Sequence, residues 1–209
     1  DTSRLAVSDF ALVRQSRWRE AIASIFDDPD FLPFLRSMRR IAVTYATHDE
    51  TGAPGSTNIV KPLYHVAWLA SRLGLQVVKP LTALHGPASA SAAASRGRLA
   101  PGARPVIGRG AAATLSDGRS EVAVVIRPVV STLPAGTTLR VELLAERRGS
   151  ELRADVTAEA ESVHVHVWWD GVDKSKGQTL KAKSRIELAY TPEANTWNGN
   201  TRLQLVVED

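Results

Sequence analysis

The chain of 209 residues contains no cysteine and a single methionine. Without thiols it can form neither a disulfide nor a thiolate zinc site, and cysteine-based redox control is excluded. A sequence free of cysteine is consistent with a reducing compartment. Because the sequence also shows no signal peptide, we expect a cytoplasmic protein.

Long apolar runs are also missing. The most apolar stretch, residues 60–75, is interrupted by Lys61, Pro62, His65 and Arg72, whereas a membrane span needs roughly 20 consecutive apolar residues. The first four residues are polar and no uninterrupted apolar segment follows them, so we expect neither a membrane span nor a signal peptide. Because position 1 is not methionine, we expect a fragment that lacks an N-terminal region.

The balance of charge is mildly basic. Lysine and arginine together number 26 against 22 aspartates and glutamates, which gives a net charge of +4. Such a surface permits contact with nucleic acid or with an acidic protein but requires neither. Hydrophobic residues make up 44% of the chain, enough for the core of one domain or two small ones.

Residues 1–85 combine helical and strand patterns. Trp18, Ile22, Ile25 and Phe26 repeat at the spacing that puts apolar side chains on one face of a helix. Gly74 stands where a helix C-terminal cap belongs. We expect helices at 8–26, 31–38 and 58–73 and strands at 41–45 and 75–79.

The rest of the chain divides into a linker and a β region. Residues 86–113, rich in Ala, Ser, Gly and Pro, lack apolar periodicity and are expected to form a linker or loop. Residues 114–209 alternate with period two between turn sequences. Strands are expected at 121–129, 138–146, 151–157, 162–169, 185–190 and 202–207. The predicted fold class is α+β, with a mixed helical first half and a mainly antiparallel sheet in the second half.

Signs of catalysis are absent from the sequence. It contains no nucleophile elbow and no glycine-rich phosphate loop. His164 and His166 face one side of a predicted strand, but no third metal ligand accompanies them. Arg36, Arg39 and Arg40 could contact a phosphate or an acidic partner, although we favour the helix dipole and solvation as their explanation. We expect no enzyme activity, no metal and no cofactor.

Three segments carry a family resemblance. Residues 8–20 read SDFALVRQSRWRE, residues 66–74 read VAWLASRLG, and residues 121–171 contain a strand ending in Ile126-Arg127-Pro128. Together they resemble the C-terminal part of OpcA-like proteins. The resemblance implies an allosteric activator and assembly factor of glucose-6-phosphate dehydrogenase, acting in the oxidative pentose phosphate pathway through protein–protein interaction and without catalysis.

Two tryptophans stand beside arginines on the predicted helices. Tryptophan and arginine are enriched at interface hot spots, although tryptophans at helical spacing more often pack in a core. The partner-binding residues predicted on this basis are Arg17, Trp18, Arg19, Trp68 and Arg72.

The tail suggests a second function. The last 25 or so residues resemble the final hairpin of the RecJ oligonucleotide-binding domain, with an Asn-Gly turn before a strand that ends in Glu208-Asp209. Aromatic side chains that stack on bases and lysines that follow a backbone are the requirements for single-strand binding. The alternative is therefore a nucleic-acid-binding module of the oligonucleotide-binding type at about 138–209, using Trp168, Trp169, Lys174, Lys176, Lys181, Lys183 and Trp197.

Overall fold

The computed structural model describes residues 16–48, 58–84, 104–105, 110–159, 162–175, 179–181, 190–197 and 200–207. The helices are α2 (Ser16–Phe26), the 3-10 helix η1 (Leu32–Ser37) and α3 (Val60–Leu73). The strands are β1 (Met38–Thr47), β2 (Gln76–Ala83), β3 (Arg104–Pro105), β4 (Ala111–Ser116), β5 (Glu121–Val130), β6 (Thr138–Arg147), β7 (Ser150–Glu159), β8 (Ser162–Trp169), β9 (Val172–Asp173), β10 (Thr179–Lys181), β11 (Tyr190–Trp197) and β12 (Asn200–Val207). The expected helix start at residue 8 and the expected strand positions 185–189 lie outside the described residues.

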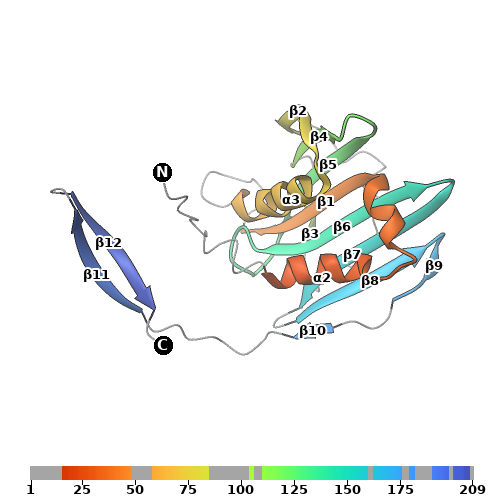
Figure 1. The fold of residues 1–209 in the computed structure, drawn as a ribbon. Coiled ribbons are helices and arrows are strands. Elements are labelled where there is room, and N and C mark those ends of the chain that lie inside the picture. Colours follow the sequence, from red (N-terminus) through yellow and green to blue (C-terminus); the bar gives the residue numbers. More distant parts are fainter. Residues whose placement is uncertain are drawn as a thin grey trace.

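One large mixed sheet dominates the fold (Figure 1). Its strands follow the order β10-β8-β7-β6-β1-β5-β4-β2, with β3 also paired to β5 and β9 to β8. Strands β1 and β5 run parallel, and the other paired strands run antiparallel. β11 and β12 form a separate antiparallel pair. The predicted α+β class with a mostly antiparallel sheet is confirmed.

The central strand of this sheet comes from the first half of the chain. β1 lies between β5 and β6, so residues on both sides of the expected linker build one sheet. Strands β3 and β4 begin within the range 86–113 that was expected to be linker or loop. The pairing of β1 with β5 joins segments more than 70 residues apart, and short-range periodicity carries no information about such a contact.

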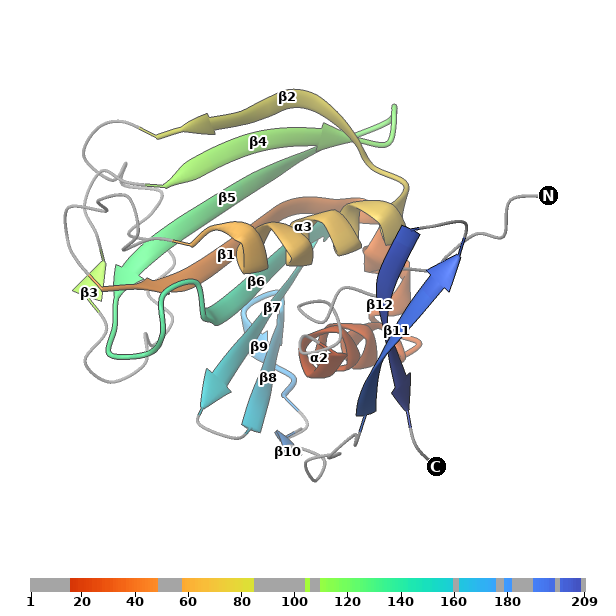
Figure 2. The ribbon, with the colours of Figure 1, turned by 90° about the vertical axis from the view of Figure 1, so that its left-hand side faces the viewer.

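Both long helices pack on the same face of the sheet (Figure 2). α2 lies over β7 and β8 and buries Trp18, Ile22, Ile25 and Phe26, the predicted apolar stripe. α3 lies over β1. Together with the facing strand residues, the two helices form one continuous hydrophobic core.

The ends of α3 follow local chemistry. At its start the side-chain oxygen of Asn58 accepts a hydrogen bond from the backbone N–H of Val60 at 3.1 Å. At its end Gly74 has a φ of +68°, a left-handed conformation that glycine adopts without steric cost. The predicted C-terminal cap is thus confirmed. Within the described residues, no helix is both long enough and apolar enough to cross a membrane.

Candidate partner groove and charged sheet face

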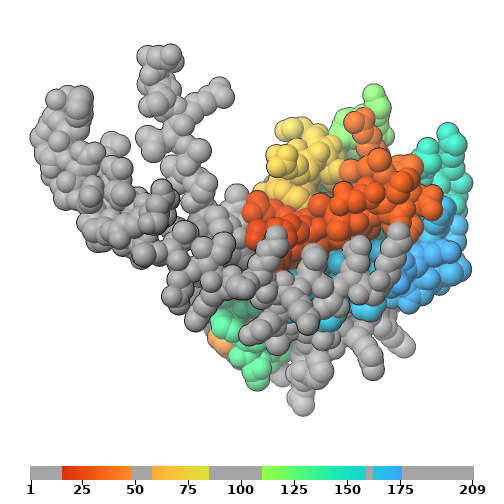
Figure 3. Space-filling model, turned by 60° about the horizontal axis from the view of Figure 1, so that its bottom comes forward, coloured from red at the N-terminus to blue at the C-terminus, as the bar shows by residue number. Residues whose placement is uncertain are grey.

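A groove of about 600 Å³ lies between α2, η1 and α3. We call it the helix groove. Figure 3 shows the surface of residues 16–48 (red to orange) bordering that of residues 58–84 (yellow). The groove is lined by Ser16, Arg19, Glu20, Ile22, Ala23, Phe26, Asp27, Leu32, Leu35, Trp68, Leu69, Arg72 and Leu73.

The helix groove combines an apolar lining with charged side chains. Leu32 is 54% exposed, an unusual exposure for a large apolar side chain beside a cavity. Trp68 and Leu35 are partly buried and pack against the core below. The charged part of the lining has both signs: Arg19 and Arg72 are basic, and Glu20 and Asp27 are acidic. An apolar groove edged by charge suits an amphipathic helix or a similar segment of a protein partner.

The structure brings three of the five predicted partner-binding residues together. Arg19, Trp68 and Arg72 line the helix groove, although they are up to 53 positions apart in the sequence. Trp18 instead packs in the core and is only 8% exposed. Arg17 is half-buried and is not part of the lining. The leucines that line the groove were not among the predicted partner-binding residues. For Leu32 and Leu35, the signal in the sequence was the short apolar helix predicted at 31–38.

His65 connects α3 to α2 and to the sheet. Its side chain is buried, its Nε2 lies 3.1 Å from Thr138 Oγ1 on β6, and its ring centroid lies 5.3 Å from that of Trp18 on α2. Burial, followed by the nearby charge of Arg19, lowers the pKa of His65 to about 4. The imidazole is therefore neutral at physiological pH.

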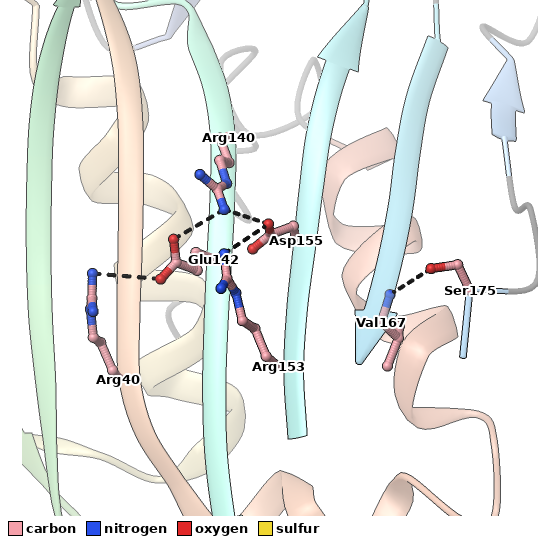
Figure 4. Close-up of polar contacts among 7 residues, drawn as sticks. All are labelled: Arg40, Arg140, Glu142, Arg153, Asp155, Val167 and Ser175. Atoms are coloured by element: carbon pink, nitrogen blue, oxygen red, sulfur yellow. Dashed lines mark hydrogen bonds and ion pairs between the residues drawn. The ribbon is translucent and has the colours of Figure 1, made fainter. Parts of the chain in front are cut away.

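The opposite face of the sheet carries a network of charged side chains, which we call the charged face (Figure 4). Strand alternation directs Val141 and Leu143 toward the helices, so Arg140 and Glu142 point to the other side. The described members of the network are Arg40 on β1, Arg127 on β5, Arg140 and Glu142 on β6, and Arg153 and Asp155 on β7.

Arg140 is the centre of this network. Its Nη2 lies 3.3 Å from Glu142 Oε2 and also donates to Asp155 Oδ2. Arg40 Nη2 approaches Glu142 Oε1 at 3.5 Å, and Arg153 Nη2 approaches Asp155 Oδ2 at 3.4 Å. The side chains of Arg140 and Asp155 are only 7% and 5% exposed. These ion pairs are therefore largely shielded from solvent.

The positive charges on this face also repel one another. Burial, followed by the charge of Arg40, lowers the pKa of Arg127, and Arg140 acts in the same direction while Glu142 opposes it. The guanidinium of Arg153 lies over the ring of Trp168 at 5.3 Å from its centroid, which adds a cation–π contact at the edge of the network.

The two neighbouring tryptophans of the nucleic-acid hypothesis, Trp168 and Trp169, lie on opposite faces of the sheet. Trp168 stacks on His166 on the charged face, whereas Trp169 packs edge-on against Phe31 and Phe34 on the helix side. Lys174 is exposed. Lys181 lies on β10 and Trp197 on β11, while Lys176 and Lys183 fall outside the described residues. Across the described parts of the chain, no group of three or more His, Asp or Glu residues could hold a metal ion.

Comparison with known families decides the relationship. The family model that describes the C-terminal domain of the glucose-6-phosphate dehydrogenase subunit matches residues 5–165, more than half of the chain. The chain belongs to this family. The match includes the helix groove and all six members of the charged network. It agrees with the resemblance to OpcA-like proteins carried by the sequence segments.

A second family model, the RecJ OB domain, matches residues 137–209. It overlaps the dehydrogenase-subunit family match at 137–165, where the strands belong to the large sheet and β6 pairs directly with β1. β11 and β12 lie in the remaining part. Neither the curated proteins nor the solved structures include a match to this chain.

Proposed function

We propose that this chain is a non-catalytic accessory subunit that binds glucose-6-phosphate dehydrogenase through the helix groove and favours the active assembly of that enzyme. The family match carries the proposal, and the groove provides a suitable surface for it. Arg19, Trp68 and Arg72 supply the charged and aromatic contacts on which interface hot spots depend.

The exposed apolar lining supplies a driving force for binding. Complete burial of one leucine or tryptophan side chain contributes roughly 1.5–3 kcal/mol or more. Burial of the exposed parts of Leu32, Leu35 and Trp68 would therefore supply several kcal/mol. A dissociation constant of about 1 µM corresponds to about 8 kcal/mol. The remainder would come from the charged rim and from further contacts.

Activation requires no chemistry by this chain. A partner that binds the active oligomer of an enzyme more tightly than its inactive form shifts the population toward the active form. A tenfold preference corresponds to about 1.4 kcal/mol of coupling free energy. We expect this effect as a lower apparent KM or a higher rate of glucose 6-phosphate oxidation.

The test measures glucose 6-phosphate oxidation by the dehydrogenase from the same source, with and without this protein in stoichiometric excess. Leu32→Glu places a charge in the groove at a side chain that is already 54% exposed, so it should abolish activation without unfolding the protein. Leu133→Glu is the matched control, because Leu133 is 42% exposed and lies in the β5–β6 connection. If the wild-type protein neither co-elutes with the enzyme nor changes its kinetics, the proposal is wrong.

The match to the RecJ OB domain supports a second candidate function, single-stranded nucleic-acid binding by residues 138–209. Trp168, with His166 and Arg153 beside it, is the aromatic surface suited to base stacking. Binding of a labelled oligonucleotide should weaken with rising salt and with Trp168→Ala, whereas Trp168→Phe should retain most of it. No binding at low salt would eliminate this candidate.

A further inference from the structure

We propose that the charged face is a binding site for a small phosphate-bearing anion, held by Arg40, Arg127 and Arg140 over the small side chains of Ala42 and Thr44 in the central strand. The inference does not depend on the proposed function, because it concerns a different face of the sheet and a ligand rather than a protein partner.

The strand register surrounds the centre of β1 with arginines. Thr44 pairs with Arg127 on one side and with Arg140 on the other. Since neighbouring strands lie about 4.8 Å apart, these two arginines flank Thr44 at a separation of roughly 10 Å. Arg40 lies further along β1 and reaches Glu142, the neighbour of Ala42. In the strand register, Ala42 and Thr44 therefore lie among the positions of the three arginines, and the carboxylate of Glu142 bridges Arg40 and Arg140.

Charge and hydrogen bonding on this face are incomplete. The ion pairs of three arginines, Arg40, Arg140 and Arg153, converge on only two carboxylates, those of Glu142 and Asp155. Among the described side chains of the charged face, the buried nitrogens without a hydrogen-bond partner are Nε of Arg40, Arg140 and Arg153, together with Arg40 Nη2, which has only the 3.5 Å ion pair with Glu142. An unmade hydrogen bond from a buried charged donor is costly, and folded proteins leave few such groups unpaired. An oxyanion would accept these hydrogen bonds and offset the repulsion between the arginines.

The degree of burial favours a small ligand. The side chains of Arg40 and Arg153 are 22% and 27% exposed, whereas that of Arg140 is only 7% exposed. A small ion can reach such groups, but a broad macromolecular surface would meet mainly the outer ones. Planar guanidinium groups bind phosphate oxygens in pairs, and this geometry makes arginine the preferred residue for phosphate recognition.

One hydrogen-bond acceptor on the charged face would distinguish a sugar phosphate from inorganic phosphate. Asp155 Oδ1 is buried and has no hydrogen-bond partner among the described residues. It could accept a hydrogen bond from a hydroxyl group next to the phosphate, as in a sugar phosphate, whereas inorganic phosphate would use the arginines alone. The shared chemistry is the phosphate group, and the two sources can be distinguished by their affinities.

The test is titration calorimetry of the full chain with inorganic phosphate, glucose 6-phosphate and glucose at constant ionic strength in chloride. We expect saturable binding of both phosphates and none of glucose. Arg40→Gln should weaken phosphate binding roughly tenfold, as expected for one charge-assisted hydrogen-bond partner. Arg119→Gln is the control, because Arg119 is exposed in the β4–β5 turn, and it should change the affinity less than about twofold.

NMR of the arginine Nε–Hε groups adds a readout of position. Phosphate should shift the signals of Arg40 and Arg140 but not that of Arg119. Should Arg40→Gln fail to fold in a thermal melt, Arg40→Lys serves as the second variant, because it keeps the charge but loses the paired N–H donors of the guanidinium. Tighter binding of glucose 6-phosphate than of phosphate would assign a role to Asp155, and equal binding would assign recognition to the arginines alone. Absence of saturation by either phosphate up to about 50 mM, or equal weakening by Arg40→Gln and Arg119→Gln, overturns the proposal.

Discussion

Acidification below pH 6.5 should destabilise this protein through His65. The folded protein holds the imidazole neutral and buried between Trp18 and Thr138, with its pKa lowered to about 4. In the unfolded chain the pKa of histidine lies near 6.5. Between these two values the unfolded state binds a proton that the folded state excludes. The contribution of His65 to stability is therefore complete above pH 6.5 and is lost as the pH falls toward 4.

The size of the effect follows from the difference in pKa. Each pKa unit corresponds to about 1.36 kcal/mol, so a difference of about 2.5 units amounts to roughly 3 kcal/mol over the whole window. At pH 4.5 most of this loss has occurred. A total stability of about 5–15 kcal/mol is typical of a domain, so a loss of roughly 2–3 kcal/mol is easily measured.

The assay is urea unfolding, followed by circular dichroism, at pH 7 and pH 4.5 for the wild type and for His65→Gln. Glutamine does not titrate, and its amide can still bond the hydroxyl of Thr138. Carboxylates lose their charge in both proteins, so the difference between the two pH dependences isolates His65. We expect the wild type to lose roughly 2–3 kcal/mol more than the variant between the two pH values. Equal pH dependences would refute the reasoning.

The remaining predictions concern the charged face, the C-terminal cap of α3 and a glycine in the β5–β6 connection. Asp155→Ala removes an ion-pair partner of the buried Arg140 and should lower the unfolding free energy by roughly 3 kcal/mol in urea; a loss below about 1 kcal/mol would show that the pair contributes little. Gly74→Ala should cost about 1 kcal/mol, since φ is +68° but the new Cβ would meet nothing within 4 Å. Gly136→Ala should cost clearly more in the same denaturation assay, because its Cβ would lie 2.7 Å from the backbone oxygen of Asn58. Equal costs for the two alanines would contradict that steric argument.

Local sequence signals predicted the helices and several strands of this fold, but β4 begins in the expected linker and β11 covers 190–197, which shares only residue 190 with the strand expected at 185–190. The apolar stripe from Trp18 to Phe26 defines the buried face of α2, and Gly74 ends α3, because spacing and backbone conformation are properties of neighbouring residues. The alternation at 121–129 and 138–146 likewise predicted the strands observed at 121–130 and 138–147. What local signals could not provide was the position of β1 between β5 and β6, which depends on contacts between distant segments.

The same distinction applies to the two candidate surfaces. Arg19, Trp68 and Arg72 were selected for their residue types, but only the packing of α2 beside α3 brings them into one groove. Arg40 was interpreted as part of a solvated helix end, whereas it lies on β1 and reaches Glu142 across the sheet. Cross-strand register determines that neighbourhood, and a shift of one residue would place every side chain on the other face.

The central position of β1 has a consequence for folding during synthesis. Thr47 ends β1, and its parallel neighbour β5 begins only at Glu121, 74 positions later. At a translation rate of roughly 5–20 residues per second, β1 would wait for roughly 4–15 s before either of its neighbouring strands is made. Throughout that interval the apolar side chains of β1 and both of its hydrogen-bonding edges lack the strands that cover them in the finished sheet. The nascent chain should therefore depend on chaperones until β6 has been synthesised, and slow translation should increase its aggregation.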